Sequence, residues 1–389
     1  MNPPPLFIRA LWPYFGTGQA VSHTCISICE RLGSPGVRVE LIYAASNPKM
    51  RRPFTVDAIP SMLKGLAFRL DRSGERIKRR AEKFFSRRIE AGDVAYIWPG
   101  TSIDAYRAAR ERGAIVVGER INCHRGTSKR ILDDAYRRLR LPPAHGITDE
   151  ALRDETEKLQ LCDFIFSPSP PVTRSLLDAG FPDRVILQST YGWDPERMSS
   201  EGQGLEKVDG VQAVFVGRAC VRKGVDLLTS AWMRAKVPGR LSLVGQMDAD
   251  ISAICAEALG SGSVKSIPFL PNVAPVYRSA DLFLFPSLEE GSPLVLYEAM
   301  ASGLASVLSP MAAGEVGRNG VDCLVVDPLD GDGWVEAIRK LAGDPALRRS
   351  IGEQARLRAQ EFTWEKVGLR RRALFEQHCR RSAVPAAKV

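Results

Sequence analysis

The sequence contains no long hydrophobic run. Its longest apolar runs, such as Val211–Val216 with Gln212 inside it, fall far short of the roughly 18 residues that a membrane span requires. The amino terminus, MNPPPLFIRALWPY, has no basic region followed by an apolar core and a cleavage site, so we expect no secretory signal. These absences favour a cytoplasmic protein.

Cysteine and histidine are scarce, with eight and four residues in 389. Cys25 and Cys29 lie four apart, which is helix-face spacing and not a Cys-x-x-Cys pair, so we expect all eight cysteines to be reduced and mostly buried. The spacing of His23, His145 and His378 offers no metal site, and we expect these three to be structural or solvated.

The charge of the chain is concentrated in its first half. Residues 1–195 hold 30 basic and 22 acidic residues, a balance of +8, whereas residues 196–389 hold 24 and 23. The content of 44% hydrophobic and 25% charged residues is that of a globular protein, and the length predicts two or three domains. The asymmetry predicts an acidic partner for the first half.

Strand-like and helix-like segments alternate along the whole chain, which is typical of the α/β class with parallel sheets covered by helices. Between the two halves lies a segment rich in Gly, Ser and charge, which predicts a linker and a domain boundary near Pro195. Helices are expected at residues 19–32 and 61–89, among others. The expected strands are 6–11, 37–44, 94–98, 114–118, 164–167 and 185–188, then 211–216, 241–244, 264–267, 282–285, 305–308 and 323–326. Two doubly wound domains, each binding ligands beyond its strand ends, predict a cleft between them.

The segment ADLFLFPSLEEGSPLVLYEAMASG, residues 280–303, joins a strand to a helix start. Ser292 and Pro293 are expected as the N-cap and the first position of that helix. The free N–H groups and the dipole of a helix start favour an anion, typically phosphate. Glu290 and Glu298 flank this start and can hold different parts of one extended ligand, an arrangement that suits a nucleotide sugar.

A second segment, VFVGRACVRKGVDLL, residues 214–228, has the same strand, turn and helix outline. Arg218 and Lys223 place two cations beyond the strand end, where a guanidinium and an ammonium suit a diphosphate. Fixed cations also stabilise the charge that develops when a nucleoside diphosphate leaves. A salt bridge from either cation to Asp226 is the alternative.

The second half resembles the retaining glycosyltransferases of family 4, which have the GT-B fold of two Rossmann-like domains facing a cleft. The resemblance rests on five motifs in order: GR-x4-KG at 217–224, FLPN at 269–272, Glu-x7-Glu at 290–298, GEVGRNGVDCLVV at 314–326 and FTW at 362–364. It implies an acceptor-binding domain at 1–195, a nucleotide-sugar-binding domain at 196–362 and a last helix, 363–389, that crosses back to the first domain.

The resemblance also implies roles for individual residues. Glu290 would meet the hydroxyls of the transferred sugar and His124, in ERINCHRG, would lie near that sugar, which makes these two the candidate catalytic residues. The donor-binding candidates are Gly16 and Gly18 in a glycine-rich loop, Arg218 and Lys223 at the diphosphate, Leu270 at the base, main-chain groups of Gly291, Ser292, Pro293 and Leu294 at the phosphates, and Glu298 at the ribose.

The reaction that the resemblance implies retains the anomeric configuration and uses neither an obligatory metal nor a separate cofactor. The donor would be a UDP- or GDP-linked sugar, and the acceptor a saccharide or a lipid-linked molecule of polysaccharide or glycolipid biosynthesis. An Asp-x-Asp pair, Asp248 and Asp250, is of the type that binds metal diphosphates elsewhere, but its place at a helix start favours an N-cap and a first-turn acid.

Two other classes of protein compete with the transferase. Gly16, Thr17 and Gly18 half-match a dinucleotide fingerprint of NAD-type oxidoreductases, but the third glycine is missing, four residues separate the loop from the first strand, and Glu40 falls inside the second strand. A non-catalytic basic module for nucleic acid or membrane would explain the charge but not the carboxylates, and we expect no nucleic-acid partner.

The stretch at residues 60–92 carries ten basic and four acidic residues. Leu63, Leu66 and Leu70, then Ile77 and Phe84, recur at helical spacing with Arg and Lys between them. Core packing with a solvated basic face is one interpretation. The other is a surface that meets anionic lipid or a lipid-linked acceptor, which would make the protein peripheral at the inner face of the membrane.

Overall fold

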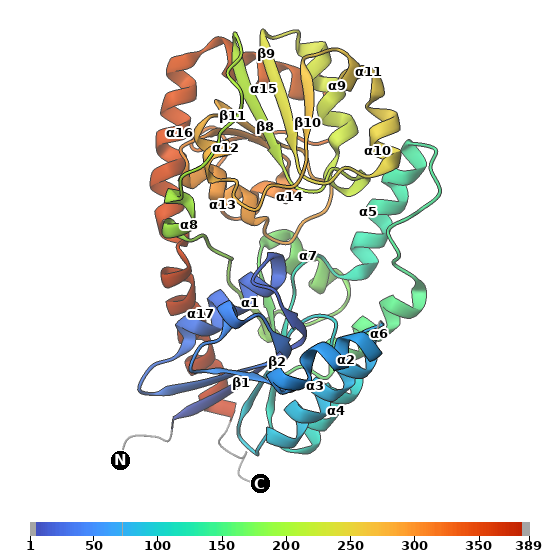
Figure 1. Ribbon diagram of the computed structural model, residues 1–389, viewed down its shortest axis with the longest axis vertical. Coiled ribbons are helices and arrows are strands. Elements are labelled where there is room, and N and C mark those ends of the chain that lie inside the picture. The colour runs from blue at the N-terminus through green and yellow to red at the C-terminus, as the bar shows by residue number, and fades with distance from the viewer. Residues whose placement is uncertain (1–4, 72, 383–389) are drawn as a thin grey trace.

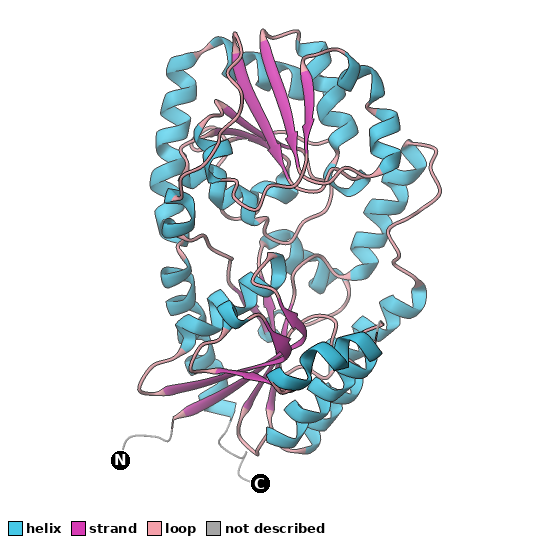
Figure 2. Ribbon diagram, viewed as in Figure 1, coloured by secondary structure: helices cyan, strands magenta, loops and turns pink. Residues whose placement is uncertain are grey.

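The computed structural model describes residues 5–71 and 73–382 (Figure 1). Two parallel sheets, each covered by helices on both faces, form two lobes one above the other (Figure 2). Two long helices, α16 (Pro345–Ala359) and α17 (Trp364–Ser382), run along one side of both lobes. This is the predicted α/β architecture of two doubly wound domains.

The first sheet has seven parallel strands in the order β3-β2-β1-β4-β5-β6-β7. The helices of its two faces pack over separate apolar layers: α1 and α17 over one, and α3, α4 and α7 over the other. The strands are β1 (Leu6–Gly16), β2 (Val37–Ser46), β3 (Thr55–Asp57), β4 (Val94–Ile97), β5 (Ile115–Glu119), β6 (Phe164–Ser167) and β7 (Ile186–Gln188). The helices are α1 (Ala20–Leu32), α2 (Lys64–Leu70), α3 (Glu75–Arg88), α4 (Ile103–Glu111), α5 (Arg125–Arg138), α6 (Asp149–Gln160) and α7 (Pro170–Asp178).

The second sheet has six parallel strands in the order β10-β9-β8-β11-β12-β13. Its strands are β8 (Val211–Val216), β9 (Gly239–Val244), β10 (Val264–Ile267), β11 (Leu282–Phe285), β12 (Ala305–Leu308) and β13 (Leu324–Val325). Its helices are α8 (Pro195–Ser199), α9 (Val225–Ala235), α10 (Ala249–Ile254), α11 (Ala256–Gly260), α12 (Ala274–Arg278), α13 (Leu294–Ala301), α14 (Pro310–Ala313), α15 (Gly331–Gly343) and α16 (Pro345–Ala359), and α17 (Trp364–Ser382) ends the described chain.

Every expected strand is present, and β3 is an additional one. β3 has only three half-buried residues, too few for a periodic signal. The first strand is longer than expected, because the residues from Trp12 to Phe15 belong to β1 and form an irregularity in its pairing with β2. Pro13 lies in that irregularity and has no N–H for a ladder hydrogen bond.

The expected helix at residues 61–89 is wrong in one respect, because the structure divides it into α2 and α3. Gly74 has a φ of 74°, a left-handed conformation that a helix interior does not allow. The Asp71 carboxylate accepts hydrogen bonds from the Ile77 N–H and the Ser73 hydroxyl, both at 2.8 Å. These bonds satisfy the start of α3 and end the preceding helix.

The chain crosses between the lobes twice, side by side. Trp193 and Thr363 form an isolated parallel bridge, in which the Trp193 N–H donates to the Phe362 carbonyl and the Trp364 N–H to the Trp193 carbonyl, each at 3.1 Å. From there α17 returns to the first domain and packs on α1, as the expected crossing helix requires. The predicted boundary near Pro195 lies between β7 and β8.

One fully buried ion pair fixes α17 to the first sheet. Arg371 donates two hydrogen bonds to the Glu119 carboxylate at the end of β5, at 2.7 and 3.1 Å, and both side chains have no exposed surface. The hydroxyls of Tyr96 and Tyr191 also donate to Glu119, at 2.5 and 3.0 Å. The cluster joins α17, β4, β5 and the crossing segment in one network.

All eight cysteines are free and seven of them are buried, as expected. None of the helices in the described residues has both the length and the apolar character that a membrane crossing requires.

Candidate functional site

A cleft of about 860 Å³ separates the two domains at the carboxyl ends of their strands. The first domain contributes the loop before α1, the segment after β2 and Ile121 and Asn122 after β5. The second domain contributes residues that follow β8, β9, β10 and β11, including Arg218, Lys223 and Glu290. Both doubly wound sheets therefore present their ligand-binding edges to one space.

Glu290 and Lys223 form a buried ion pair that lines the cleft. The Lys223 ammonium contacts the Glu290 carboxylate, which also accepts a hydrogen bond from the Ser287 hydroxyl at 2.7 Å. Burial alone would raise the pKa of Glu290, but Lys223 and Arg222 outweigh it and lower that pKa below its ordinary value. The carboxylate is thus ionised at neutral pH and is an acceptor for hydroxyl groups.

Two tight turns bring this pair together. Gly224 follows Lys223 with a φ of 64°, and a Cβ at this position would lie 2.6 Å from the Pro286 carbonyl oxygen. Only glycine allows the turn after β8 to approach the turn after β11 so closely. The glycine of the GR-x4-KG motif is therefore explained by backbone packing.

Arg222 is a third cation of the site and was missed from the sequence. Its Nη1 lies 3.4 Å from the Glu290 carboxylate and 3.5 Å from that of Glu289, and it donates to the Glu289 carbonyl at 2.8 Å. Arg222 lines the cleft beside Lys223. Arg222 occupies an unspecified position of GR-x4-KG, so the motif did not identify it, and the signal in the sequence was its place next to Lys223 after a strand end.

Arg218 lies at the mouth of the cleft with 64% of its side chain exposed, and it pairs with Asp248 at 2.7 Å. The alternative partner proposed from the sequence, Asp226, instead pairs with Arg138 of α5 at 2.7 Å. Asp248 occupies the N-cap position of α10, as expected, but its side chain makes no capping hydrogen bond. Arg218 is therefore an exposed cation that a ligand can reach.

Glu298 also lines the second-domain side of the cleft and is buried in α13. It accepts a hydrogen bond from the Tyr277 hydroxyl at 3.2 Å, and Arg197 lies 3.8 Å from its other oxygen. Burial raises the pKa of this carboxyl above its ordinary value. Arg197, in α8, gave no signal in the sequence because its place depends on the crossing of the chain between the domains.

The start of α13 differs from the expectation by one residue. The helix begins at Leu294 with Pro293 at the N-cap position, where no side chain caps it. The Ser292 hydroxyl bonds the Tyr297 hydroxyl at 2.5 Å instead, and the Tyr297 oxygen accepts from the Tyr191 N–H at 3.2 Å. Ser292 is thus linked through Tyr297 to the segment that crosses between the domains, and its side chain does not accept hydrogen bonds from the first N–H groups of α13.

Gly16 and Gly18 of the first domain and Leu270 of the second differ in whether they reach the cleft. Gly18 lines the cleft with a φ of 75°, whereas Gly16 does not and packs against Tyr43. Leu270 lines the cleft with the exposed ring of Phe269 beside it. His23, expected to be structural or solvated, also lines the cleft.

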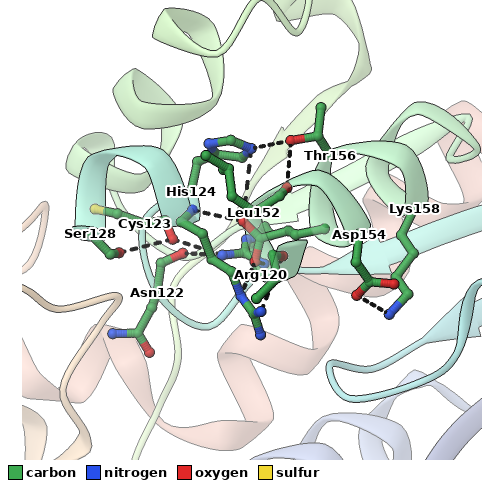
Figure 3. Close-up of polar contacts among 12 residues, drawn as sticks. Arg120, Asn122, Cys123, His124, Ser128, Leu152, Asp154, Thr156 and Lys158 are labelled. Atoms are coloured by element: carbon green, nitrogen blue, oxygen red, sulfur yellow. Dashed lines mark hydrogen bonds and ion pairs between the residues drawn. The ribbon is translucent and has the colours of Figure 1, made fainter. Parts of the chain in front are cut away.

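His124 does not line the cleft, although it was a candidate catalytic residue. Its Nδ1 accepts from the Gly126 N–H at 3.3 Å, which makes it the N-cap of α5. Its Nε2 lies 3.2 Å from the Thr156 hydroxyl, which itself donates to the Leu152 carbonyl (Figure 3). The imidazole is therefore neutral with its proton on Nε2, and burial lowers its pKa. Both ring nitrogens are used inside the first domain.

The loop after β11 in the second domain contacts the loop after β5 in the first domain. Glu289, 2% exposed, accepts hydrogen bonds from the Asn122 side chain at 2.7 Å, the Cys123 N–H at 3.1 Å and the Ser128 hydroxyl at 3.0 Å. Gly291 touches the opposite main chain, and a Cβ there would lie 1.8 Å from the Ile121 carbonyl oxygen. Gly291 therefore joins the domains and does not line the cleft.

Among residues 5–71 and 73–382, no group of three or more His, Cys, Asp or Glu side chains is arranged to hold a metal ion. Glu40, the residue weighed as a dinucleotide ligand, is buried within β2 and paired with Arg9 at 2.8 Å and with Arg88. It does not line the cleft.

A family model matches part of the second domain, and solved structures align with almost the whole chain. Residues 210–344 match the family model "Glycosyl transferases group 1". D-inositol 3-phosphate glycosyltransferase of Rhodococcus opacus is 30% identical over 203 residues, 47% of this chain and 42% of the relative. That of Segniliparus rotundus is 34% identical over 181 residues, 42% of this chain and 38% of the relative. The matches thus span about two fifths of the length of these curated relatives.

Solved structures share the fold at low sequence identity. Sucrose-phosphate synthase from Thermosynechococcus elongatus aligns over 96% of this chain and 98% of its own, with a TM-score of 0.69 and 19% identity. Anabaena Alr3699/HepE, in complex with UDP, aligns over 96% of this chain and 100% of its own, with a TM-score of 0.68 and 13% identity. Residues 210–344 are thus similar to the glycosyl transferases group 1, and the two domains together have the GT-B fold.

Proposed function

We propose that this protein transfers a sugar from a nucleotide-diphosphate sugar to a saccharide or lipid-linked acceptor. The observation that carries the proposal is the grouping of Arg222, Lys223 and Glu290 on one wall of the cleft, with Glu298 on the same domain further along it. Cations and carboxylates in this order match a donor with a diphosphate between two hydroxyl-bearing sugars.

Each group has a distinct task in this proposal. Arg218 and Arg222 bind the diphosphate with guanidinium forks, and Lys223 adds an ammonium beside it. As the sugar–phosphate bond breaks, these cations stabilise the charge that accumulates on the departing diphosphate. Glu290, held ionised by Lys223, accepts hydrogen bonds from the sugar hydroxyls, and Glu298 does the same for the ribose.

We further propose that transfer retains the anomeric configuration and requires no metal, because three cationic side chains at the diphosphate supply the charge that a metal would bring. The first donors to test are UDP-linked sugars, since the structurally similar Anabaena protein is described in complex with UDP and with UDP-glucose. GDP-linked sugars come next. The proposed location is the cytoplasm, at the inner face of the membrane, in polysaccharide or glycolipid biosynthesis.

Donor binding can be measured without knowledge of the acceptor. UDP, GDP, ADP and their glucose and mannose conjugates are added to the purified protein, and the melting temperature is recorded with Mg²⁺ and with EDTA. A ligand that binds only the folded protein at a hundred times its Kd stabilises it by about 2.7 kcal/mol. We expect one nucleotide sugar to raise the melting temperature equally in both buffers.

Arg222→Ala tests the site, with Arg240→Ala as the matched control because Arg240 pairs with Glu206 outside the cleft. Loss of charge-assisted hydrogen bonds of about 1.5–3 kcal/mol raises Kd roughly tenfold to a hundredfold, and the control should bind as wild type does. A shift produced by NAD and by no nucleotide sugar would replace the proposal with the oxidoreductase. Product NMR then decides whether the anomeric configuration is retained.

A further inference from the structure

The first domain carries an exposed apolar ridge on α2 and the turn before it. Met62 is 89% exposed, Leu66 55% and Leu70 70%, and Leu63 is exposed beside them. The inner side of α2 is held by Phe68, whose ring packs edge-on against Phe15 at 5.5 Å. Four large apolar side chains next to one another in water are costly for a monomeric surface and mark an interaction site.

Next to the ridge runs a groove of about 760 Å³, with cations along its other wall. Leu63, Leu66 and Leu70 face Arg76, Arg79, Arg80, Lys83 and Arg87 of α3 across a floor of Ala58, Ile59 and Ile77. Figure 1 shows α2, α3 and α4 stacked together on one side of the first domain, with α1 and α17 elsewhere. Apolar side chains thus lie beside cations on one surface.

These cations are available to a partner. Arg76, Arg79, Lys83 and Arg87 are exposed and make no ion pair within the described residues, and Arg80 makes only a long hydrogen bond to the Ala58 carbonyl. The acids of the stretch are partly turned inward. Glu82 is 5% exposed and accepts two hydrogen bonds from Ser102, at 2.7 and 2.8 Å.

Asp71, also buried, caps α3 through the Ile77 N–H. Only Glu75 and Glu90 of the stretch remain exposed as acids. Lys78 pairs with Glu75 and Arg88 with Glu40. Within the described residues, the exposed cations of α3 that make no ion pair are therefore Arg76, Arg79, Arg80, Lys83 and Arg87.

The surface is connected to the first-domain wall of the cleft. The Lys64 ammonium, at the start of α2, contacts the Ser46 carbonyl at the end of β2 and lies over the Phe15 ring at 4.2 Å. Arg51 contacts the Ser61 hydroxyl. The loop that follows β2 contributes Asn47, Lys49 and Met50 to the cleft.

We infer that α2 and α3 form a docking surface for an anionic lipid bilayer. The ridge of Met62, Leu66 and Leu70 enters the interface between headgroups and acyl chains, and the cations of α3 contact lipid phosphates. The mouth of the cleft then faces a membrane-held acceptor, a consequence that rests on the proposed transfer reaction. Docking itself does not depend on the sugar or on turnover.

Vesicle flotation tests the inference with the intact chain and no nucleotide. One set of vesicles is phosphatidylcholine alone, and the other contains about one third phosphatidylglycerol. We expect binding to the anionic vesicles that falls as salt rises above about 0.1 M, where the Debye length is about 10 Å. Binding to the neutral vesicles should be weak, because only the insertion of the apolar side chains would stabilise it and the attraction between the cations and anionic lipid would be missing.

Two variants locate the surface. Arg79→Gln/Lys83→Gln/Arg87→Gln should lower the partition coefficient about a hundredfold, since each cation near an anionic surface contributes about fivefold. Lys340→Gln/Arg349→Gln/Arg356→Gln removes the same charge from exposed positions of α15 and α16 and should leave binding unchanged. Leu66→Ser/Leu70→Ser should weaken binding at all salt concentrations, and circular dichroism confirms that each variant is folded.

Equal, negligible binding of the wild-type protein to both kinds of vesicle would overturn the inference. So would equal losses in the α3 and control variants, because nonspecific charge would then explain binding. Self-association in sedimentation that Leu66→Ser/Leu70→Ser abolishes, without vesicle binding, would assign the surface to a second copy of the chain. Retained donor binding in the same samples would show that the transferase proposal survives the failure of docking.

Discussion

The substitution Arg371→Met is expected to destabilise the protein more than any other single change considered. Arg371 on α17 and Glu119 on β5 are both fully buried, and their two hydrogen bonds are at 2.7 and 3.1 Å. Methionine fills similar volume but leaves the Glu119 carboxylate buried without its cation. Breaking a buried pair by removing one partner costs about 3–5 kcal/mol.

That cost can be converted into a melting temperature. For domains of about 150–250 residues, 1 kcal/mol corresponds to about 2–4 °C, so the expected decrease is roughly 6–20 °C by differential scanning fluorimetry. Arg372→Met is the matched control, because Arg372 makes one exposed hydrogen bond, to the Gly33 carbonyl at 2.8 Å. It should cost no more than about 1 kcal/mol.

The double variant Arg371→Met/Glu119→Gln separates charge from packing. In the native protein the hydroxyls of Tyr96 and Tyr191 donate to different oxygens of Glu119. Glutamine carries no charge, and its single amide oxygen still accepts from one of these hydroxyls while its NH2 group can donate to the oxygen of the other. The double variant should therefore recover more than half of the loss. A melting temperature of Arg371→Met within about 2 °C of wild type, or a double variant less stable than the single one, would refute the reasoning.

Four further predictions concern the cleft and its surroundings. Glu290→Gln should lower kcat about a hundredfold or more in a transfer assay while the protein still unfolds cooperatively, and wild-type turnover would remove Glu290 from the site. Burial raises the pKa of Glu298 above its ordinary value of 4.5, so at neutral pH the ionised carboxylate is less stable in the folded protein than in the unfolded chain. Glu298→Gln, which cannot ionise, should therefore melt at a higher temperature than wild type at neutral pH and at the same temperature near about pH 4, where Glu298 is protonated. His124→Asn should preserve both turnover and stability because asparagine is also a good N-cap, and a large loss of kcat at unchanged stability would restore the catalytic role. Gly291→Ala should lower kcat/KM at least about tenfold because its Cβ forces the domains apart at Ile121, whereas Gly260→Ala, with open space around it, should have no effect.

The parallel sheets could be predicted from the sequence because their strands are short apolar runs separated by helices. All twelve expected strands formed, and β3 was missed because its three residues are only half buried. The division of residues 61–89 was visible in principle, since Asp71 and Gly74 are residues that typically end one helix and begin the next. We expected one continuous helix because apolar residues recur at helical spacing both before and after residues 71–74.

The part of the site that could be predicted from the sequence consists of residues that lie close to the ends of strands. Glu290, Lys223 and Glu298 follow strand ends, where a doubly wound sheet places its ligands, and all three line the cleft. His124 follows a strand end too, yet its ring turns inward to cap α5, a choice of rotamer that the sequence does not encode locally. Arg197 and Tyr191 reach the cleft only because the chain crosses between the domains, and Gly291 serves an interface that neither domain has alone.

The return of α17 has a consequence for the order in which the protein is made. The ring of Phe375 packs between Tyr96 and Phe166 of the first sheet, and Gly368 lies directly against Arg31 of α1. The ribosome completes β7 and then the whole second domain before α17 emerges, a delay of about 10–35 s at 5–20 residues per second. During that time, the α1 side of the first domain lacks its outer layer and Glu119 lacks its cation. The surface of the first domain that α17 covers is therefore exposed to solvent until the carboxyl-terminal domain has been translated.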